Sequence, residues 1–117
     1  LTPSAIRQEG SEEIFLLSYA MIRKFRDSYF QGNVDKSLPD VSPILGDLTG
    51  MPPALFTVGT RDLLLDDSLF MYGRWLSYGS NAEIIIVPGA DHAFNAFPSE
   101  TTTSVENKIS EFVKSVL

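Results

Sequence analysis

Two short apolar runs, separated by a stretch with helical character, set the strongest limit on how this chain can fold. The runs are residues 54–58 (ALFTV) and 83–87 (EIIIV), and each places apolar residues at consecutive positions. Such runs are typical of strands in a parallel sheet that helices cover on both faces. The stretch between them, DDSLFMYGRWLSYG, fits a helix with Asp66 or Asp67 as N-cap and Gly79 after its end. The sequence therefore predicts a βαβ unit with a right-handed crossover.

Two more helices are expected, one on each side of this unit. Apolar residues recur in steps of three and four over residues 12–29, with Ser11 as N-cap and Gly32 closing the stretch. We expect Met21 and Phe25 of this helix, and Trp75 of the crossover helix, to lie in the core. The last helix is expected over residues 101–116, and its buried side chains would be Val105, Ile109, Phe112, Val113 and Val116. Residues 33–53, rich in Pro, Gly and Asp, predict a long surface connection.

A pair of parallel strands does not make a stable sheet by itself, because three or more strands are normally needed. The 117 residues contain no other convincing strand. We therefore interpret the chain as the C-terminal part of a larger α/β protein. In that interpretation residues 1–50 form a helix and a connection, and residues 51–117 form the last two strands, the crossover helix and the C-terminal helix. In isolation the chain is expected to unfold with low cooperativity or to associate through its strand edge.

Charge and composition exclude several classes of function. The net charge is −6, which argues against nucleic-acid binding, since that function usually needs a basic face. No apolar run approaches the roughly 18 residues that span a bilayer. The first residues, LTPSAIRQEG, lack the pattern of a signal peptide. The chain has no cysteine, so disulfides and thiolate chemistry are excluded, and the cytoplasm is the favoured location.

Two residues with catalytic potential follow the two expected strands. Asp62, in GTRD, comes four residues after the first strand, and His92, the one histidine of the chain, comes five after the second, in PGADH. The crossover places both loops at the carboxyl edge of the sheet, where sites form in open α/β sheets. A carboxylate bound to one imidazole nitrogen leaves the other free to take a proton from a nucleophile. The alternative interpretations are that Asp62 only forms a turn or caps a helix, and that His92 is an ordinary loop histidine without a catalytic role.

Residues 42–97 resemble the C-terminal part of α/β-hydrolases of the hormone-sensitive-lipase-like group of esterases and lipases. The resemblance rests on DLTGMPPALFTVGTRDLLLDD around Asp62, on VPGADHAFNAF around His92 and on their spacing. It implies an α/β-hydrolase fold, with residues 1–50 following the sixth strand, and a triad in the order Ser, Asp, His. Asp62 would then be the triad acid and His92 the triad base. Leu63 stands where the family often has Pro, and Ala93 where Gly is usual.

The nucleophile that this resemblance implies is not in the sequence. The family's GxSxG and HGGG motifs are absent, and no serine has a glycine two positions away on both sides. Ser80, in YGSN, would lie at the far end of the crossover helix, on the wrong edge of the sheet. We therefore expect the serine to lie outside these 117 residues, in the N-terminal part of the same protein, and the isolated chain to be inactive.

The resemblance implies a carboxylic ester hydrolase of the serine type, which forms an acyl-enzyme with a small-molecule ester and needs no metal or cofactor. Phe94 and Phe97 would line the acyl pocket or, alternatively, pack the histidine in place. The acidic stretch DLLLDD lacks the alternating oxygen ligands of a calcium loop, so no metal site is expected there. The alternative interpretation is that the chain is a catalytically inactive fragment or a ligand-binding relative with the same fold. The presence of a serine elbow upstream would separate the two.

Overall fold

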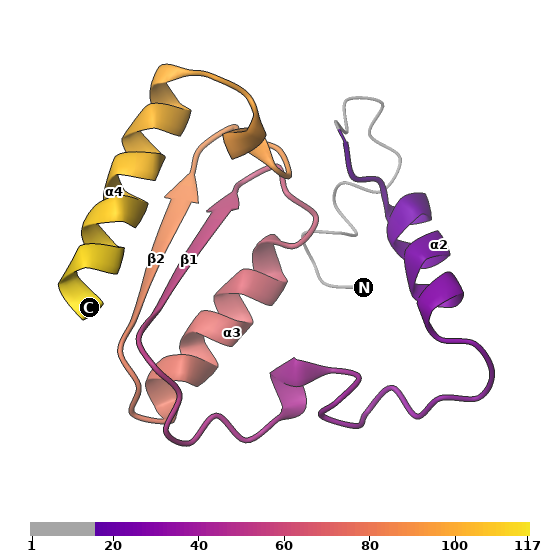
Figure 1. Cartoon of the computed structure of the whole chain (residues 1–117). Coiled ribbons are helices and arrows are strands. Elements are labelled where there is room, and N and C mark those ends of the chain that lie inside the picture. The colour runs from indigo at the N-terminus through magenta and orange to yellow at the C-terminus, as the bar shows by residue number, and fades with distance from the viewer. Residues whose placement is uncertain (1–15) are drawn as a thin grey trace.

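The computed structural model describes residues 16–117, which form a βαβ unit with one helix before it and one after it (Figure 1). In chain order, the elements are α2 (Tyr19–Tyr29), the 3₁₀ turn η1 (Pro43–Leu45), β1 (Ala54–Gly59), α3 (Leu65–Ser77), β2 (Ala82–Val87), the 3₁₀ turn η2 (Phe94–Ala96) and α4 (Glu100–Val116).

The two strands pair in parallel, as the sequence predicts. Ala54 lies opposite Ala82, and the register continues without a break to Gly59 opposite Val87. Both strands lie within one residue of their expected limits. In the part of the chain that the structure describes, the sheet consists of these two strands.

The helices α3 and α4 lie on opposite faces of the strand pair (Figure 1). The ring of Phe56 makes edge-on contacts with Tyr72 and Trp75 of α3, at centroid distances of 6.3 and 5.8 Å. Because side chains alternate along a strand, Leu55 points to the other face, where it lines a groove together with Phe112 of α4. The strand pair is thus the middle layer of three.

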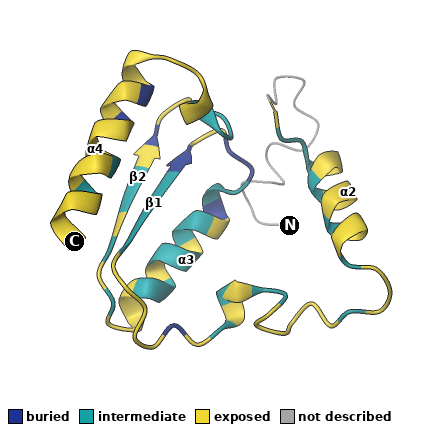
Figure 2. Cartoon of the chain, in the orientation of Figure 1, coloured by how far each residue is buried: buried dark blue, intermediate teal, exposed yellow. Residues whose placement is uncertain are grey.

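Burial is concentrated at the carboxyl ends of the strands. Figure 2 shows the buried residues near the tips of β1 and β2 and in the adjacent first turns of α3 and α4. They include Val58, Leu63, Val87 and Val105. The helices do not cover the strands completely, since Ile86 is 42% exposed; one helix on each face does not cover every strand side chain. The packed region therefore lies directly below the two loops that carry Asp62 and His92.

The start of α3 differs from the expected one. Neither Asp66 nor Asp67 caps it, because the helix already begins at Leu65 and both aspartates lie in its first turn. The carboxylate of Asp62 instead accepts a hydrogen bond from the Leu64 N–H at 2.8 Å. The candidate triad acid therefore also orders the turn that leads into the helix, as in the turn-forming alternative for this aspartate. The end of α3 at Ser77, followed by Gly79, agrees with the prediction.

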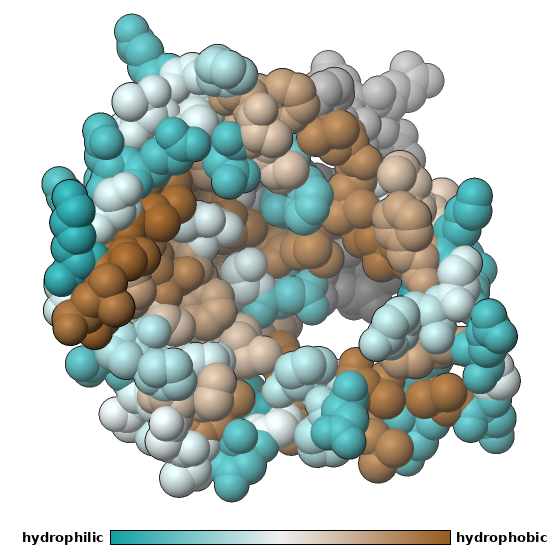
Figure 3. All heavy atoms as spheres, viewed as in Figure 1, coloured by the Kyte–Doolittle hydropathy of each residue, from teal (hydrophilic) through white to brown (hydrophobic). Residues whose placement is uncertain are grey.

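The outer helices bury less than their apolar patterns predict. In α2, Met21 and Phe25 are 40% and 57% exposed, so placing them in the core is wrong for the described residues. In α4, Val105 is buried, but Val113 and Val116 are close to half exposed. A strip of hydrophobic surface runs beside α4 in Figure 3. The periodicity correctly marked apolar faces, but within residues 16–117 these faces have few side chains against which to pack.

Helix α2 begins later than the helix predicted over residues 12–29. Ser18 has an extended backbone and its hydroxyl accepts from the Met21 N–H, so it caps a helix that starts at Tyr19. Leu16 before it has φ +68°, a left-handed conformation that interrupts a helix. The proposed cap Ser11 lies outside the described residues. Among residues 16–117, no helix combines the length and apolar character needed to cross a membrane.

Candidate active site

The loop after β1 holds Asp62 in a fixed position. Its amide donates to the carbonyl of Gly59 at 3.2 Å, which closes a tight turn at the end of the strand. The next residue, Leu63, is only 1% exposed and anchors the turn in the core. Asp62 is itself 7% exposed. Because both oxygens of this buried carboxylate accept hydrogen bonds, the carboxylate has little freedom to rotate.

The loop after β2 contains a tight turn that displaces His92 along the sheet edge. The Ala90 N–H donates to the Val87 carbonyl at 3.3 Å, with Pro88 and Gly89 between them. Gly89 has φ +71°, and proline followed by a residue of positive φ suits a type II turn. Strand partners such as Ala54 and Ala82 are 28 positions apart, whereas Asp62 and His92 are 30 apart. The turn therefore accommodates two extra residues in the second loop.

Hydrogen bonds from backbone amides join the two loops beyond the ends of the strands. The Arg61 N–H donates to the Ala90 carbonyl at 3.0 Å, and the Gly89 N–H donates to the Thr60 hydroxyl at 2.8 Å. The approach is closest at Gly59, where a Cβ would lie 2.0 Å from the Ala90 carbonyl oxygen. Only glycine fits there, so the sequence GTRD owes its first residue to this contact.

The structure brings Asp62 and His92 together. The Nδ1 atom of His92 lies 2.9 Å from Oδ2 of Asp62. The aspartate side chain is 9% exposed and the histidine side chain 37%. Because an ionised carboxylate can only accept a hydrogen bond, the proton of a neutral imidazole lies on Nδ1, and Nε2 has a free lone pair. This arrangement provides an oriented imidazole whose outer nitrogen can accept a proton.

The segment after His92 is fixed to the start of α4. Ala93 has φ +56°, in the left-handed region that favours glycine, which gives a physical reason for the glycine usual in the family. Thr102, 5% exposed, donates its hydroxyl proton toward the Phe97 carbonyl at 2.8 Å. Its amide donates to the Ser99 hydroxyl, the N-cap of α4. Thr102 could not be singled out from the sequence, because nothing in the local pattern marks a threonine in a helix as buried.

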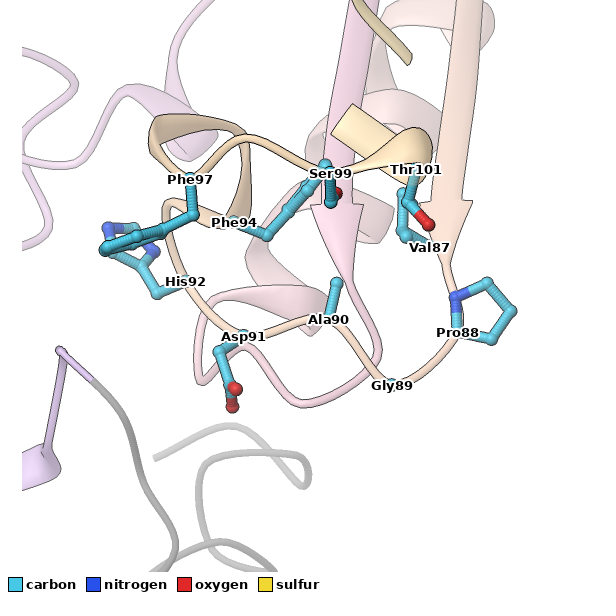
Figure 4. Close-up of a pocket in the computed structure, with 10 residues that line it drawn as sticks. All are labelled: Val87, Pro88, Gly89, Ala90, Asp91, His92, Phe94, Phe97, Ser99 and Thr101. Carbon is cyan, nitrogen blue, oxygen red and sulfur yellow. The ribbon is translucent and has the colours of Figure 1, made fainter. Parts of the chain in front are cut away.

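A cavity of about 300 Å³ lies between the His92 loop and the start of α4. Figure 4 shows His92 and Phe97 at one end of it and Pro88 at the other. Phe94 also lines this cavity, so both phenylalanines singled out in the sequence lie near the histidine. Phe97 is 45% exposed. An apolar ring beside a reactive imidazole can contact the hydrocarbon part of a ligand or limit the motion of the imidazole.

Among the residues described, no group of three or more acidic, histidine or cysteine side chains could hold a metal ion. Asp66 is 9% exposed and Asp67 lies one position further along the first turn of α3. Burial raises the pKa of the Asp67 carboxyl, and the neighbouring charges of Asp66 and Asp62 raise it further. Asp66 and Asp67 are therefore part of the first turn of α3.

We expect Gly59→Ala, made in the full-length protein, to impair both stability and the site. The added methyl group would overlap the Ala90 carbonyl, and overpacking of this kind costs about 1–3 kcal/mol. Displacing the His92 loop by about 1 Å would lower activity about 10²-fold. Thermal unfolding and turnover would be measured together. Gly73→Ala is the matched control, because no other part of the described chain, apart from the backbone of α3 itself, lies within 4 Å of its Cβ position. Equal behaviour of the two variants would contradict the prediction.

We expect Asp67→Asn to raise the melting temperature at pH 7. The folded-state pKa of Asp67 lies above its ordinary value of 3.8, so the ionised form destabilises the folded protein at neutral pH. This penalty disappears as the pH falls through the raised pKa, and the advantage of the variant should vanish near or below about pH 4. Thermal melts across this pH range provide the measurement.

Asp47→Asn is the control for this experiment. Hydrogen bonds from the Thr49 hydroxyl and amide lower the pKa of Asp47, so neutralising it should not raise the melting temperature at pH 7. A lower melting temperature for Asp67→Asn would mean that attraction of the charge to the helix N-terminus outweighs its desolvation.

The chain is similar to known proteins over most of its length. A family model described as the alpha/beta hydrolase fold matches residues 2–96. An esterase of Acinetobacter venetianus is 40% identical over 68 residues, which cover 58% of this chain and 22% of the esterase. An acetyl-hydrolase of Streptomyces hygroscopicus is 43% identical over 53 residues, which cover 45% of this chain and 17% of that protein.

The fold agrees closely with that of solved esterases. The hyperthermophilic esterase of the archaeon Pyrobaculum calidifontis superimposes with a TM-score of 0.89 and 28% identity. The match covers 99% of this chain and 39% of that esterase. The chain thus spans less than half the length of the relatives that it matches.

Proposed function

Since this chain belongs to the α/β-hydrolase fold family, we propose that it contributes the acid and the base of a Ser-His-Asp triad to a carboxylic ester hydrolase. The single observation on which the proposal rests is the 2.9 Å contact between His92 Nδ1 and Asp62 Oδ2 at the carboxyl ends of adjacent parallel strands. In this role His92 is the general base, and Asp62 orients it and stabilises the imidazolium that forms.

The nucleophile in this proposal is a serine from another part of the same protein. The chain covers 39% of the Pyrobaculum calidifontis esterase, and its own serines lack the glycines of a nucleophile elbow. His92 Nε2 takes the proton as the serine Oγ attacks the ester carbonyl. His92 then gives this proton to the departing alcohol, and an acyl-serine remains. In the second half of the reaction, His92 takes a proton from water as the water attacks the acyl-serine, which releases the acid and restores the serine.

We further propose that the substrate is a small ester and that Phe94 and Phe97 contact its apolar part. The supporting observations are the position of both rings beside His92 and the names of two relatives, an esterase and an acetyl-hydrolase. The chemistry as proposed uses side chains and water alone, so no metal or cofactor takes part.

Covalent labelling of the full-length protein tests the proposal. A fluorophosphonate should form one adduct per molecule on a serine outside the present 117 residues, and p-nitrophenyl acetate hydrolysis should stop in parallel. Mass spectrometry of peptides locates the adduct. A protein that neither reacts with the probe nor hydrolyses p-nitrophenyl esters would favour the non-catalytic, ligand-binding reading.

A further inference from the structure

An ion pair lies immediately beside the Asp62–His92 contact. Arg61 directly precedes Asp62, Asp91 directly precedes His92, and Nε of Arg61 donates to Oδ1 of Asp91 at 3.1 Å. The arginine side chain is 44% exposed and the aspartate side chain 27%. The pair therefore bridges the same two loops as the dyad, one residue earlier in each.

The backbone bonds between the loops reach only as far as Ala90. Up to that residue, the contacts of Thr60 with Gly89 and of Arg61 with Ala90 hold the second loop against the first. His92 lies two residues further on, after a turn that has already shifted the register by two positions. Over these last two residues, the Arg61–Asp91 side-chain contact continues the connection.

Asp91 is also a potential competitor of Asp62 for the imidazole. Figure 4 shows the side chains of Asp91 and His92 directed away from each other. A carboxylate in the adjacent position, if released from its arginine, could turn toward the imidazole and accept from Nδ1 in place of Asp62. Held by Arg61, it cannot make that exchange without losing a charge-assisted hydrogen bond.

We propose that Arg61 and Asp91 are positioning residues for His92. They act through the second loop, keeping the imidazole aligned with Asp62, and they do not contact the substrate. The proposal rests on the proposed function of the dyad. An exposed ion pair adds little to folding stability, whereas small displacements of a catalytic base lower turnover strongly. The pair should therefore matter far more for turnover than for melting.

The test uses the full-length protein with Arg61→Gln, Asp91→Asn, the double variant and Arg61→Lys, assayed for p-nitrophenyl ester hydrolysis. Each neutralising change should lower kcat about 5- to 30-fold, with KM and the melting temperature nearly unchanged. Because both changes remove the same Arg61–Asp91 contact, the double variant should be no slower than the slower single variant. Arg61→Lys, which keeps the charge, should recover part of kcat.

The matched control is a second exposed ion pair far from the site, Arg26 with Asp27 in α2, whose atoms are 2.7 Å apart. Arg26→Gln and Asp27→Asn should leave kcat unchanged. The inference is overturned if Arg61→Gln and Asp91→Asn leave kcat at the wild-type level, or if their effects on kcat multiply in the double variant. His92→Ala separates this failure from failure of the proposed function, because only the latter would leave the His92→Ala variant active.

Discussion

Replacing His92 with alanine in the full-length protein is expected to lower kcat for ester hydrolysis about 10⁴-fold or more, with little change in KM. In the proposed triad the imidazole takes the serine proton; its Nδ1 lies 2.9 Å from Asp62, and 37% of the side chain is exposed. Its loss leaves the serine unactivated while substrate contacts persist. Steady-state kinetics and pre-steady-state acylation give the measurement.

Asn95→Ala is the matched control for this variant, because Asn95 is an exposed residue of the same loop, three positions after His92. It should retain activity within about twofold, since surface substitutions usually have small effects. Near-wild-type hydrolysis by His92→Ala would show that His92 is not the base. Equal loss in both variants would point instead to a general disturbance of the loop.

Asp62→Asn is expected to lower kcat by a similar factor, about 10⁴-fold. The asparagine side chain has nearly the same shape, but it can turn its amide toward Nδ1 and favour the imidazole tautomer that lacks a proton there. The outer nitrogen would then carry the proton and could not accept one from serine. The measurement is the kcat of the variant, together with melting to establish that the fold persists.

Asp67→Asn makes the same chemical change five residues further along the chain and should retain activity. The two variants should also differ in stability, because Asp62 is 7% exposed and its carboxylate accepts a hydrogen bond from the Leu64 amide. We expect Asp62→Asn to melt lower and Asp67→Asn to melt higher than the wild-type protein at pH 7. An active Asp62→Asn variant would exclude Asp62 as the triad acid.

The parts of the structure that the sequence predicted are those governed by local pattern. Consecutive apolar residues specified β1 and β2 to within one residue, because such runs suit strands between two helical layers. The predicted crossover also placed Asp62 and His92 at one edge of the sheet, since parallel strands joined by a crossover end on the same side. The catalytic roles of these residues remain predictions.

The features that escaped prediction depend on contacts between distant segments. The 3.6-residue pattern identified the apolar face of α4, but it could not determine that Val105 would be buried and Val113 exposed. The cap of α3 was assigned wrongly because the Asp62 carboxylate bonds both the amide of the turn before the helix and the histidine. The Arg61–Asp91 pair joins residues 30 positions apart, and no local signal indicates such a partner.

Because buried residues are concentrated near the tips of β1 and β2, local unfolding should begin elsewhere in the molecule. Backbone amides exchange slowly with solvent where local opening requires the core to come apart. The slowest-exchanging amides should therefore be those near Val58 and Val87, next to the dyad, while the opposite ends of the strands fray first. As the temperature of the full-length protein rises, the Asp62–His92 pair should therefore keep its geometry until this core unfolds, so that activity and the core are lost together.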